Sequence, residues 1–135
     1  MAFNGTWIEY KNENFDEFLA ALGVDAVRRQ LARNISLHVT IKQDGERFTV
    51  FEKSKLRSKE LTWTSGEEVE GEDPDGTKIK GTFTLEAPNK YVGQFQRMSD
   101  GKQIKISREV DGDEMLQLTS INDVEVRRYF KRKAE

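Results

Sequence analysis

The sequence contains no cysteine and only one histidine, His38, and both shortages limit what the protein can be. Without cysteine there is no disulfide framework and no thiolate to act as a nucleophile or to bind zinc. A Ser-His-Asp arrangement would have to use His38, and neither a nucleophile-elbow motif nor a glycine-rich phosphate loop is present. We therefore expect a protein that is not an enzyme and that needs no cofactor or metal.

Long apolar runs and a strong excess of either charge are also missing. No apolar stretch approaches the roughly 18 residues needed to span a bilayer, and the N-terminus does not resemble a signal peptide. The formal net charge is −2, and scattered basic residues are offset by acidic ones, which argues against nucleic-acid binding. For 135 residues, 36% of them hydrophobic, we expect one monomeric cytoplasmic domain over residues 1–135.

A helical pattern is confined to the N-terminal third of the chain, after a first strand expected over residues 5–12. Asn14 is expected to cap a short helix, with Glu17 at the spacing of a capping box, and Gly23 is expected to end it. Asp25 then opens a second short helix. Two short helices joined by a glycine turn form a helical hairpin.

From Leu37 onward the helical period disappears and turn signals recur about every ten residues. Short alternating runs lie between these turns. With a break near residues 54–57 they give about ten strands, joined mostly by hairpin-length connections. Such a long antiparallel meander tends to curl or close, so the sequence predicts an all-β fold. The turn signals are Asp44-Gly45, Ser65-Gly66, Asp75-Gly76, Pro88-Asn89, Asp100-Gly101, Asp111-Gly112 and Asn122-Asp123.

Two of the last strands each carry an arginine where the alternation calls for an apolar residue. Arg108 falls on the face of Ile104 and Ile106, and Arg128 on the face of Val124 and Val126. A buried guanidinium stays charged, so something anionic is expected beside each arginine. Either the protein supplies an internal Glu or Asp, or a ligand supplies a carboxylate.

For a single arginine these two alternatives carry equal weight. Two arginines with Gln117 on the strand between them favour a ligand, because a guanidinium matches a carboxylate through two hydrogen bonds and Gln117 can donate a third. The sequence therefore predicts a carboxylate site formed by Arg108, Arg128 and Gln117.

A helical hairpin inserted after the first strand of a ten-stranded meander resembles the intracellular lipid-binding protein family, most of all its intestinal fatty acid-binding branch. The resemblance implies a ten-strand antiparallel up-and-down β-barrel of two near-orthogonal sheets, capped by a helix-turn-helix. Glu9 departs from it, since the family signature has an apolar residue there. The blocks that carry the resemblance are residues 5–7, 14–19, 27–32, 43–50, 75–77, 81–83, 107–114 and 128–131.

The resemblance also bears on the arginines, because the family holds a fatty acid carboxylate with arginines at the positions matching Arg108 and Arg128. Its Arg-x-Tyr or Arg-x-Phe motif fits both residues 127–129 and residues 128–130. The alternation places Arg128 and Phe130 on the apolar face, so we expect Arg127 to point outward.

The acyl tail is expected to lie against apolar inward residues, although each of them taken alone could be ordinary core. Phe83 matches an aromatic residue beside the ligand in the intestinal branch, whereas Trp7 matches a core tryptophan. The expected tail contacts are Phe83, Phe130, Val39, Leu61, Trp63, Phe95, Met115 and Ile106. The family further implies a portal, expected to include Arg28, Arg29, Leu31, Arg57 and Asp75, although Arg57 could equally be a surface charge. The arginines of the helical cap either form an ordinary solvated face or make transient contact with a membrane.

The function expected from these observations is intracellular binding and transport of a long-chain fatty acid or a similar anionic lipid. Retinoic acid and bile acids are the alternatives for the same cavity. Phe130 stands where retinoid binders have tyrosine, which favours a fatty acid, whereas Gln117 and Thr119 leave the bile acids open. A filled barrel that acts as a protein-interaction module is the alternative without a ligand.

Overall fold

The computed structural model describes residues 1–33, 35–73 and 76–134, in which ten strands and two helices occur. The expected all-β fold, with both helices between the first and second strands, is confirmed. The break expected near residues 54–57 lies between β3 and β4. The elements are β1 (Gly5–Glu13), α1 (Phe15–Ala21), α2 (Ala26–Ala32), β2 (His38–Asp44), β3 (Arg47–Lys53), β4 (Ser58–Thr64), β5 (Glu68–Glu72), β6 (Lys78–Ala87), β7 (Lys90–Arg97), β8 (Gln103–Asp111), β9 (Glu114–Ile121) and β10 (Val124–Arg132).

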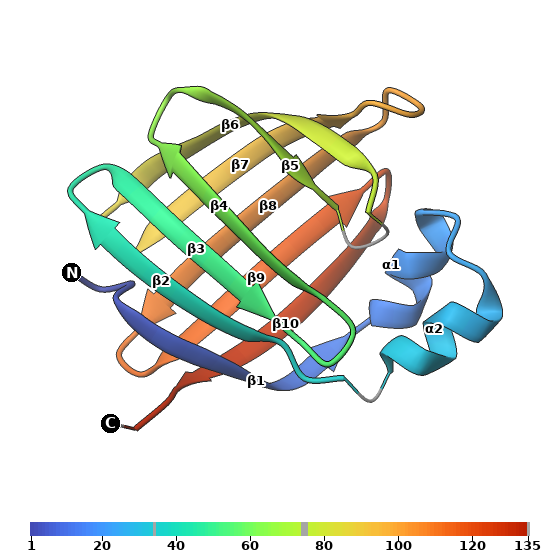
Figure 1. Cartoon of the computed structure of the whole chain (residues 1–135), viewed down its shortest axis with the longest axis horizontal. Coiled ribbons are helices and arrows are strands. Elements are labelled where there is room, and N and C mark those ends of the chain that lie inside the picture. The colour runs from blue at the N-terminus through green and yellow to red at the C-terminus, as the bar shows by residue number, and fades with distance from the viewer. Residues whose placement is uncertain (34, 74–75, 135) are drawn as a thin grey trace.

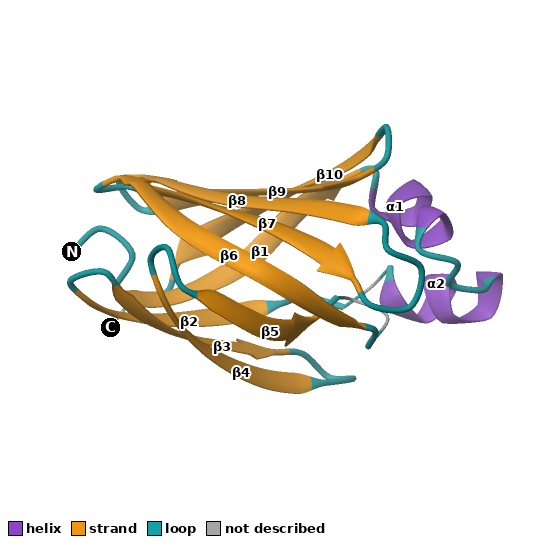
Figure 2. Ribbon diagram, turned by 90° about the horizontal axis from the view of Figure 1, so that it is seen from above, coloured by secondary structure: helices purple, strands orange, loops and turns teal. Residues whose placement is uncertain are grey.

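The ten strands form one antiparallel sheet that wraps into a barrel. Their order is β4-β3-β2-β1-β10-β9-β8-β7-β6-β5, so nearly every strand pairs with its neighbours in sequence, and β1 pairs with β10 to join the two ends of the chain. The sheet folds over into two layers (Figure 2). Its two edge strands, β4 and β5, are neighbours in sequence but do not pair, which leaves one gap in the barrel wall.

The N-terminus lies at the end of the barrel opposite the helices (Figure 1), and Phe3 near that terminus belongs to an aromatic core. Phe48 stacks on Trp63 with ring centroids 4.2 Å apart, and Trp63 stacks on Phe83 at 4.7 Å. Phe3 and Tyr91 pack edge-on or tilted against this stack. Offset and edge-to-face ring contacts add to the burial of the rings themselves, so this core is firmly packed.

The two helices cap the other end of the barrel. Phe18 and Leu19 of α1 are buried and α1 packs against β10, whereas no residue of α2 is buried. The second helix begins after Asp25, as expected, and the Asp25 side chain caps α2 by accepting a hydrogen bond from the backbone N–H of Arg28 at 2.9 Å. Both helices span seven residues, and within the described ranges no helix is long and apolar enough to cross a bilayer.

The expected capping box at Asn14 is wrong. Asn14 has a left-handed backbone conformation, with φ of 68°, and its side chain makes no capping hydrogen bond. Its amide instead donates to the backbone oxygen of Glu125 at 3.1 Å. A left-handed residue turns its side chain away from the first turn of the helix, so Asn14 attaches the start of α1 to β10 rather than capping α1.

Candidate ligand-binding site

A cavity of about 650 Å³ lies inside the barrel, within the range of about 300–1,000 Å³ typical of pockets that enclose small molecules. Five of the eight expected tail contacts line it, namely Leu61, Trp63, Phe83, Phe95 and Ile106. Other apolar side chains on its wall are Phe15, Ala32, Ile35, Leu37, Val50, Leu56, Ile79 and Ile104. Most of the wall surface is therefore apolar, but polar and charged side chains also line it, including Glu60, Glu70 and Lys78.

The other three expected tail contacts, Val39, Met115 and Phe130, do not line the cavity. They are fully or almost fully buried in the core, where Val39 lies opposite Trp7 and Phe130 lies opposite Met115 in the sheet. They do face inward, as the alternation predicted, but they belong to the buried core cluster and not to the cavity wall. Trp7 is buried in the same core, in agreement with its expected packing role.

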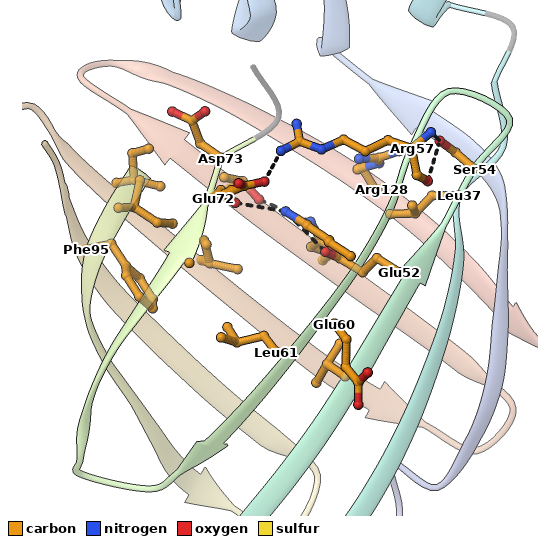
Figure 3. Close-up of a pocket in the computed structure, with 18 of the residues that line it drawn as sticks. Leu37, Glu52, Ser54, Arg57, Glu60, Leu61, Glu72, Asp73, Phe95 and Arg128 are labelled. Atoms are coloured by element: carbon orange, nitrogen blue, oxygen red, sulfur yellow. Dashed lines mark hydrogen bonds and ion pairs between the residues drawn. The ribbon is translucent and has the colours of Figure 1, made fainter. Parts of the chain in front are cut away.

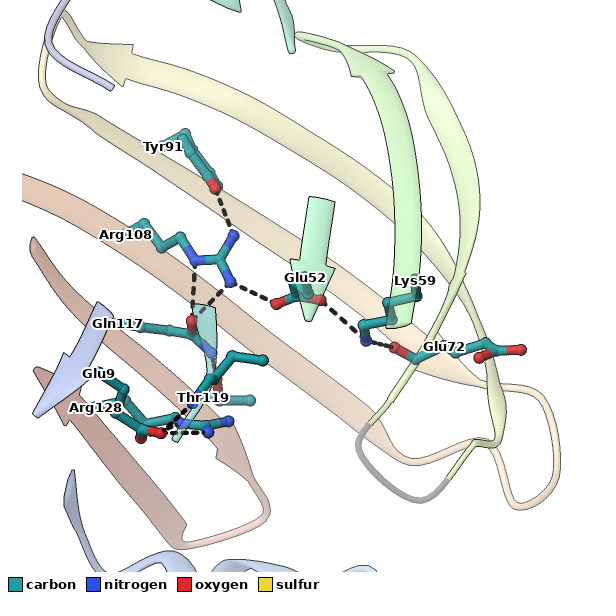
Figure 4. A network of polar contacts seen from close by, with 10 residues as sticks. Glu9, Glu52, Lys59, Glu72, Tyr91, Arg108, Gln117, Thr119 and Arg128 are labelled. Atoms are coloured by element: carbon teal, nitrogen blue, oxygen red, sulfur yellow. Dashed lines mark hydrogen bonds and ion pairs between the residues drawn. The ribbon is translucent and has the colours of Figure 1, made fainter. Parts of the chain in front are cut away.

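The expected carboxylate site is a row of polar residues across adjacent strands. Tyr91 on β7 is in register with Arg108 on β8, which is in register with Gln117 on β9, which is in register with Arg128 on β10. Residues in register lie on the same face of a sheet, so all four side chains point into the barrel (Figure 4). The Arg127 side chain is 52% exposed and that of Arg128 only 11%, as the face assignment expected.

Arg108 is held in place by three polar neighbours. Its Nε and Nη2 donate to Oε1 of Gln117 at 2.9 and 2.8 Å, and its Nη1 donates to the Tyr91 hydroxyl at 3.0 Å. Its Nη2 also donates to Oε1 of Glu52 at 2.7 Å, which forms a charge-assisted hydrogen bond. The position of the guanidinium is therefore fixed before any ligand arrives.

Glu52 on β3 is shared between two cations, since its Oε2 lies 3.3 Å from Nζ of Lys59 on β4. Burial acts to raise the pKa of the Glu52 carboxyl, but the charges and hydrogen bonds of Lys59 and Arg108 outweigh it and lower this pKa to about 2. Burial likewise acts to lower the pKa of Arg108, yet Tyr91 and Glu52 raise it overall. Burial raises the pKa of the Tyr91 hydroxyl, which stays neutral. The cluster of Arg108, Lys59 and Glu52 thus carries one positive charge in excess.

Arg128 has a different partner. Its Nε and Nη2 donate to the two carboxylate oxygens of Glu9 at 2.6 and 2.9 Å. Glu9 also accepts a hydrogen bond from the backbone N–H of Leu37 at 3.1 Å, and the Arg128 guanidinium lies 4.8 Å from the centre of the Phe15 ring. This pair is buried beneath the helical cap, and its two charges cancel.

The protein itself therefore places a carboxylate beside each arginine, which is the alternative that the sequence had not favoured for two arginines. Gln117 was expected to donate to a ligand; in the structure its Oε1 accepts from Arg108 and its Nε2 donates to the Thr119 hydroxyl at 3.3 Å. The two arginines differ in how fully their charge is compensated, because Glu52 is shared between Arg108 and Lys59, whereas Glu9 pairs with Arg128 and, within the described residues, with no lysine.

The gap between β4 and β5 is bridged by side chains near the helical end of the cavity. Arg57 lines the cavity and forms an ion pair with Glu72 (Figure 3). Lys59 Nζ donates to the backbone oxygen of Glu72 at 2.8 Å (Figure 4). Three other expected portal residues, Arg28, Arg29 and Leu31, lie on α2 and do not line the cavity. Asp75 lies outside the described residues.

Sequence reasoning missed Glu9, Glu52 and Lys59 as parts of this site. Each continues the inward face of its strand, since Glu9 follows Trp7 by two residues and Glu52 follows Val50 by two. Lys59 precedes Leu61 by two residues in the same way. The rule that singled out the two arginines, a charge on an apolar face, would also have found these three residues.

Comparison with known proteins places this geometry among lipid-binding barrels. A model of the lipocalin / cytosolic fatty-acid binding protein family matches residues 1–134. The intestinal fatty acid-binding protein of Rattus norvegicus is 39% identical over 132 residues, which cover 98% of this chain and 99% of the relative. The cellular retinoic acid-binding protein 1 of Hippocampus comes is 38% identical over 133 residues, which cover 96% and 97%.

Among solved structures, a Schistosoma mansoni fatty acid-binding protein in complex with arachidonic acid is similar to this chain. It superposes with a TM-score of 0.89 at 28% sequence identity, and the match covers 98% of this chain and 97% of that one. The similarity thus extends over the whole barrel and its helical cap.

Proposed function

The chain belongs to the lipocalin / cytosolic fatty-acid binding protein family, and on that premise we propose that it binds a long-chain fatty acid in its internal cavity and carries it through the cytoplasm. It acts as a monomeric carrier and not as an enzyme. The observation that carries this proposal is a largely apolar cavity with a fixed, buried arginine on its wall, in a cluster that has one positive charge in excess.

Arg108 is the carboxylate anchor in this proposal. Its guanidinium is already oriented by Gln117 and Tyr91, so a ligand carboxylate does not have to order it. The excess positive charge of the cluster with Lys59 and Glu52 attracts an anion to a guanidinium that is itself buried. Arg128 was also expected to bind the ligand carboxylate. This expectation stays a prediction, and the ion pair of Arg128 with Glu9 argues against it.

The acyl tail supplies most of the binding energy. Each methylene group removed from water contributes about 0.8 kcal/mol, so a long acyl chain reaches micromolar affinity or better after the cost of ordering it. Leu61, Phe83 and Ile106 are among the cavity residues against which it packs. The head-group contacts then set the orientation of the ligand and the preference for an acid.

Transfer of the ligand involves transient contact of the helical end with a membrane. Val27 and Leu31 of α2 are 71% and 59% exposed, and Leu56 in the turn between β3 and β4 is 63% exposed. Arg28 on α2 is also exposed, as is Lys55 in that turn. Exposed apolar side chains next to cations suit the interface of an anionic bilayer.

Calorimetric titration of the delipidated protein with oleate tests the proposal. We expect saturable one-to-one binding that weakens about 10- to 100-fold in Arg108→Leu, the range for losing hydrogen bonds to a charged group. Arg127→Leu is the matched control, because that arginine belongs to the same part of the sheet but points outward. Absence of binding to the folded, delipidated protein rules out the fatty acid proposal.

Retinoic acid is a second candidate ligand, because relatives named cellular retinoic acid-binding protein 1 match nearly the whole chain. Titration with retinoic acid under the same conditions compares the two ligands directly. If retinoic acid binds more tightly than oleate, retinoic acid becomes the proposed ligand.

A further inference from the structure

We propose that Glu9 determines where the ligand head group binds by occupying Arg128, so that a ligand carboxylate is confined to Arg108. This inference rests on the proposed binding of a fatty acid and concerns which of two inward arginines receives its acid group. It assigns a role to Glu9, a buried acid at a position of β1 where the resemblance calls for an apolar residue.

The geometry of Glu9 is that of a bound carboxylate. Two oxygens meet the guanidinium of Arg128 at 2.6 and 2.9 Å, which is the fork arrangement that a ligand acid would adopt. The backbone N–H of Leu37 donates a third hydrogen bond at 3.1 Å. The Glu9 side chain is only 3% exposed, so the protein has built the anion into this position and shields it from water.

Charge repulsion excludes a second acid from the same place. A ligand carboxylate bound to Arg128 would lie close to that of Glu9 in a poorly solvated site, and two carboxylates that share one cation repel each other strongly there. At Arg108 the situation differs, because Lys59 supplies a second cation to Glu52 and leaves the cluster with excess positive charge. An anion is therefore tolerated at Arg108 and rejected at Arg128.

Arg128 would nevertheless bind an acid if the charge on Glu9 were removed. It lines the cavity, and its Nη1 forms no hydrogen bond within the part of the chain that the structure describes. Phe15 packs against its guanidinium and keeps it directed toward the interior. Loss of the Glu9 charge thus leaves an oriented, uncompensated cation on the cavity wall.

A rescue experiment in the Arg108→Leu background tests this inference. Oleate is titrated calorimetrically into the parent, Arg108→Leu, Arg108→Leu with Glu9→Gln, and that double variant with Arg128→Leu added. We expect Glu9→Gln to restore at least about tenfold of the affinity lost in Arg108→Leu, as a new charge-assisted contact would. Adding Arg128→Leu should remove the restored affinity.

Glu125→Gln in the same background is the matched control, because it removes an outward glutamate from β10 and should restore nothing. Glu9→Gln removes the charge and keeps the size of the side chain. Circular dichroism shows whether this variant folds like the parent. If it does not, Glu9→Val replaces it in the experiment. If the parent binds oleate but neither folded Glu9 variant restores affinity, the inference is wrong and the proposed function stands. If the parent does not bind oleate, the proposed function fails and the inference fails with it.

Discussion

Glu9 and Arg128 form a two-point ion pair although they do not lie opposite each other in the sheet. Glu9 is in register with Phe130, and the register shifts by one residue between Glu9 and Lys11, which marks a bulge in β1. The extra residue places Asn12 rather than Lys11 opposite Arg128. The bulge therefore keeps a second cation away from Arg128 and leaves Glu9 to neutralise it.

Removal of Arg128 alone should destabilise the protein strongly. Arg128→Leu leaves the Glu9 carboxylate buried without a counter-charge, which costs about 3–5 kcal/mol of unfolding free energy. Arg128→Leu combined with Glu9→Val should recover most of this loss, because no buried charge remains. Urea unfolding monitored by circular dichroism measures both. Arg127→Leu on the outer face should cost less than about 1 kcal/mol, and equal stability of the single and double variants would contradict the prediction.

The Glu52 carboxyl should make stability depend on pH in the acidic range. Its pKa is lowered to about 2 in the folded protein from the ordinary value of 4.5, so folding favours the ionised form. Its contribution is complete above about pH 4.5 and disappears as the pH falls to about 2, a change on the order of 3 kcal/mol. Urea unfolding at a series of pH values measures this slope. Glu52→Gln should flatten it, whereas Glu67→Gln, at an exposed position, should leave it unchanged.

Ligand binding should be reported by one tryptophan and not by the other. Trp63 lines the cavity, whereas Trp7 is fully buried and its indole N–H donates to the backbone oxygen of Phe3 at 3.0 Å. We expect oleate to change the fluorescence of Trp63 because only that ring touches the bound ligand. The Trp7→Phe variant should keep the response and Trp63→Phe should lose most of it. The reverse pattern would show that the tail does not lie where the cavity predicts.

Arg57 should affect the rate of ligand exchange more than affinity. Its ion pair with Glu72 is partly exposed and joins strands that have no backbone pairing. A partly exposed ion pair is worth about 0.2–1 kcal/mol, so Arg57→Ala should speed oleate release by at most about fivefold. Stopped-flow transfer of oleate to an acceptor protein measures the rate. Arg47→Ala, an exposed change at the opposite end of β3, serves as the control and should leave the rate unaltered.

Strand alternation and turn signals predicted the antiparallel meander and the direction of both arginines, whereas the ten-strand barrel with its helical cap was what the family resemblance implied. The turn signals divided the chain into ten strands, and period-two alternation fixed which face of β8 and β10 points inward. Alternation does not distinguish a residue on the cavity wall from one in the solid core. Phe130 and Phe83 both face inward, yet only Phe83 meets the cavity, whereas Phe130 lies fully buried in the core cluster.

The acidic partners of the arginines were missed for a different reason. Glu9 and Glu52 each occupy an inward position in their own strand. Their partners Arg128 and Arg108 lie 119 and 56 residues away in the sequence. A charge on an apolar face predicts that a partner exists without identifying it. The partner becomes evident only when the barrel brings β1 beside β10 and β3 across from β8.

The unpaired edges of β4 and β5 give the barrel a seam that can widen without breaking the sheet. Apart from the turn that connects the two strands, the contacts that cross this seam among the described residues involve side chains, such as those of Arg57 and Lys59 with Glu72. Elsewhere, expansion of the wall would break a ladder of backbone hydrogen bonds. Ligands of different girth can thus be accommodated by movement of two short strands, while the eight others keep the polar row of Arg108 and Gln117 in place.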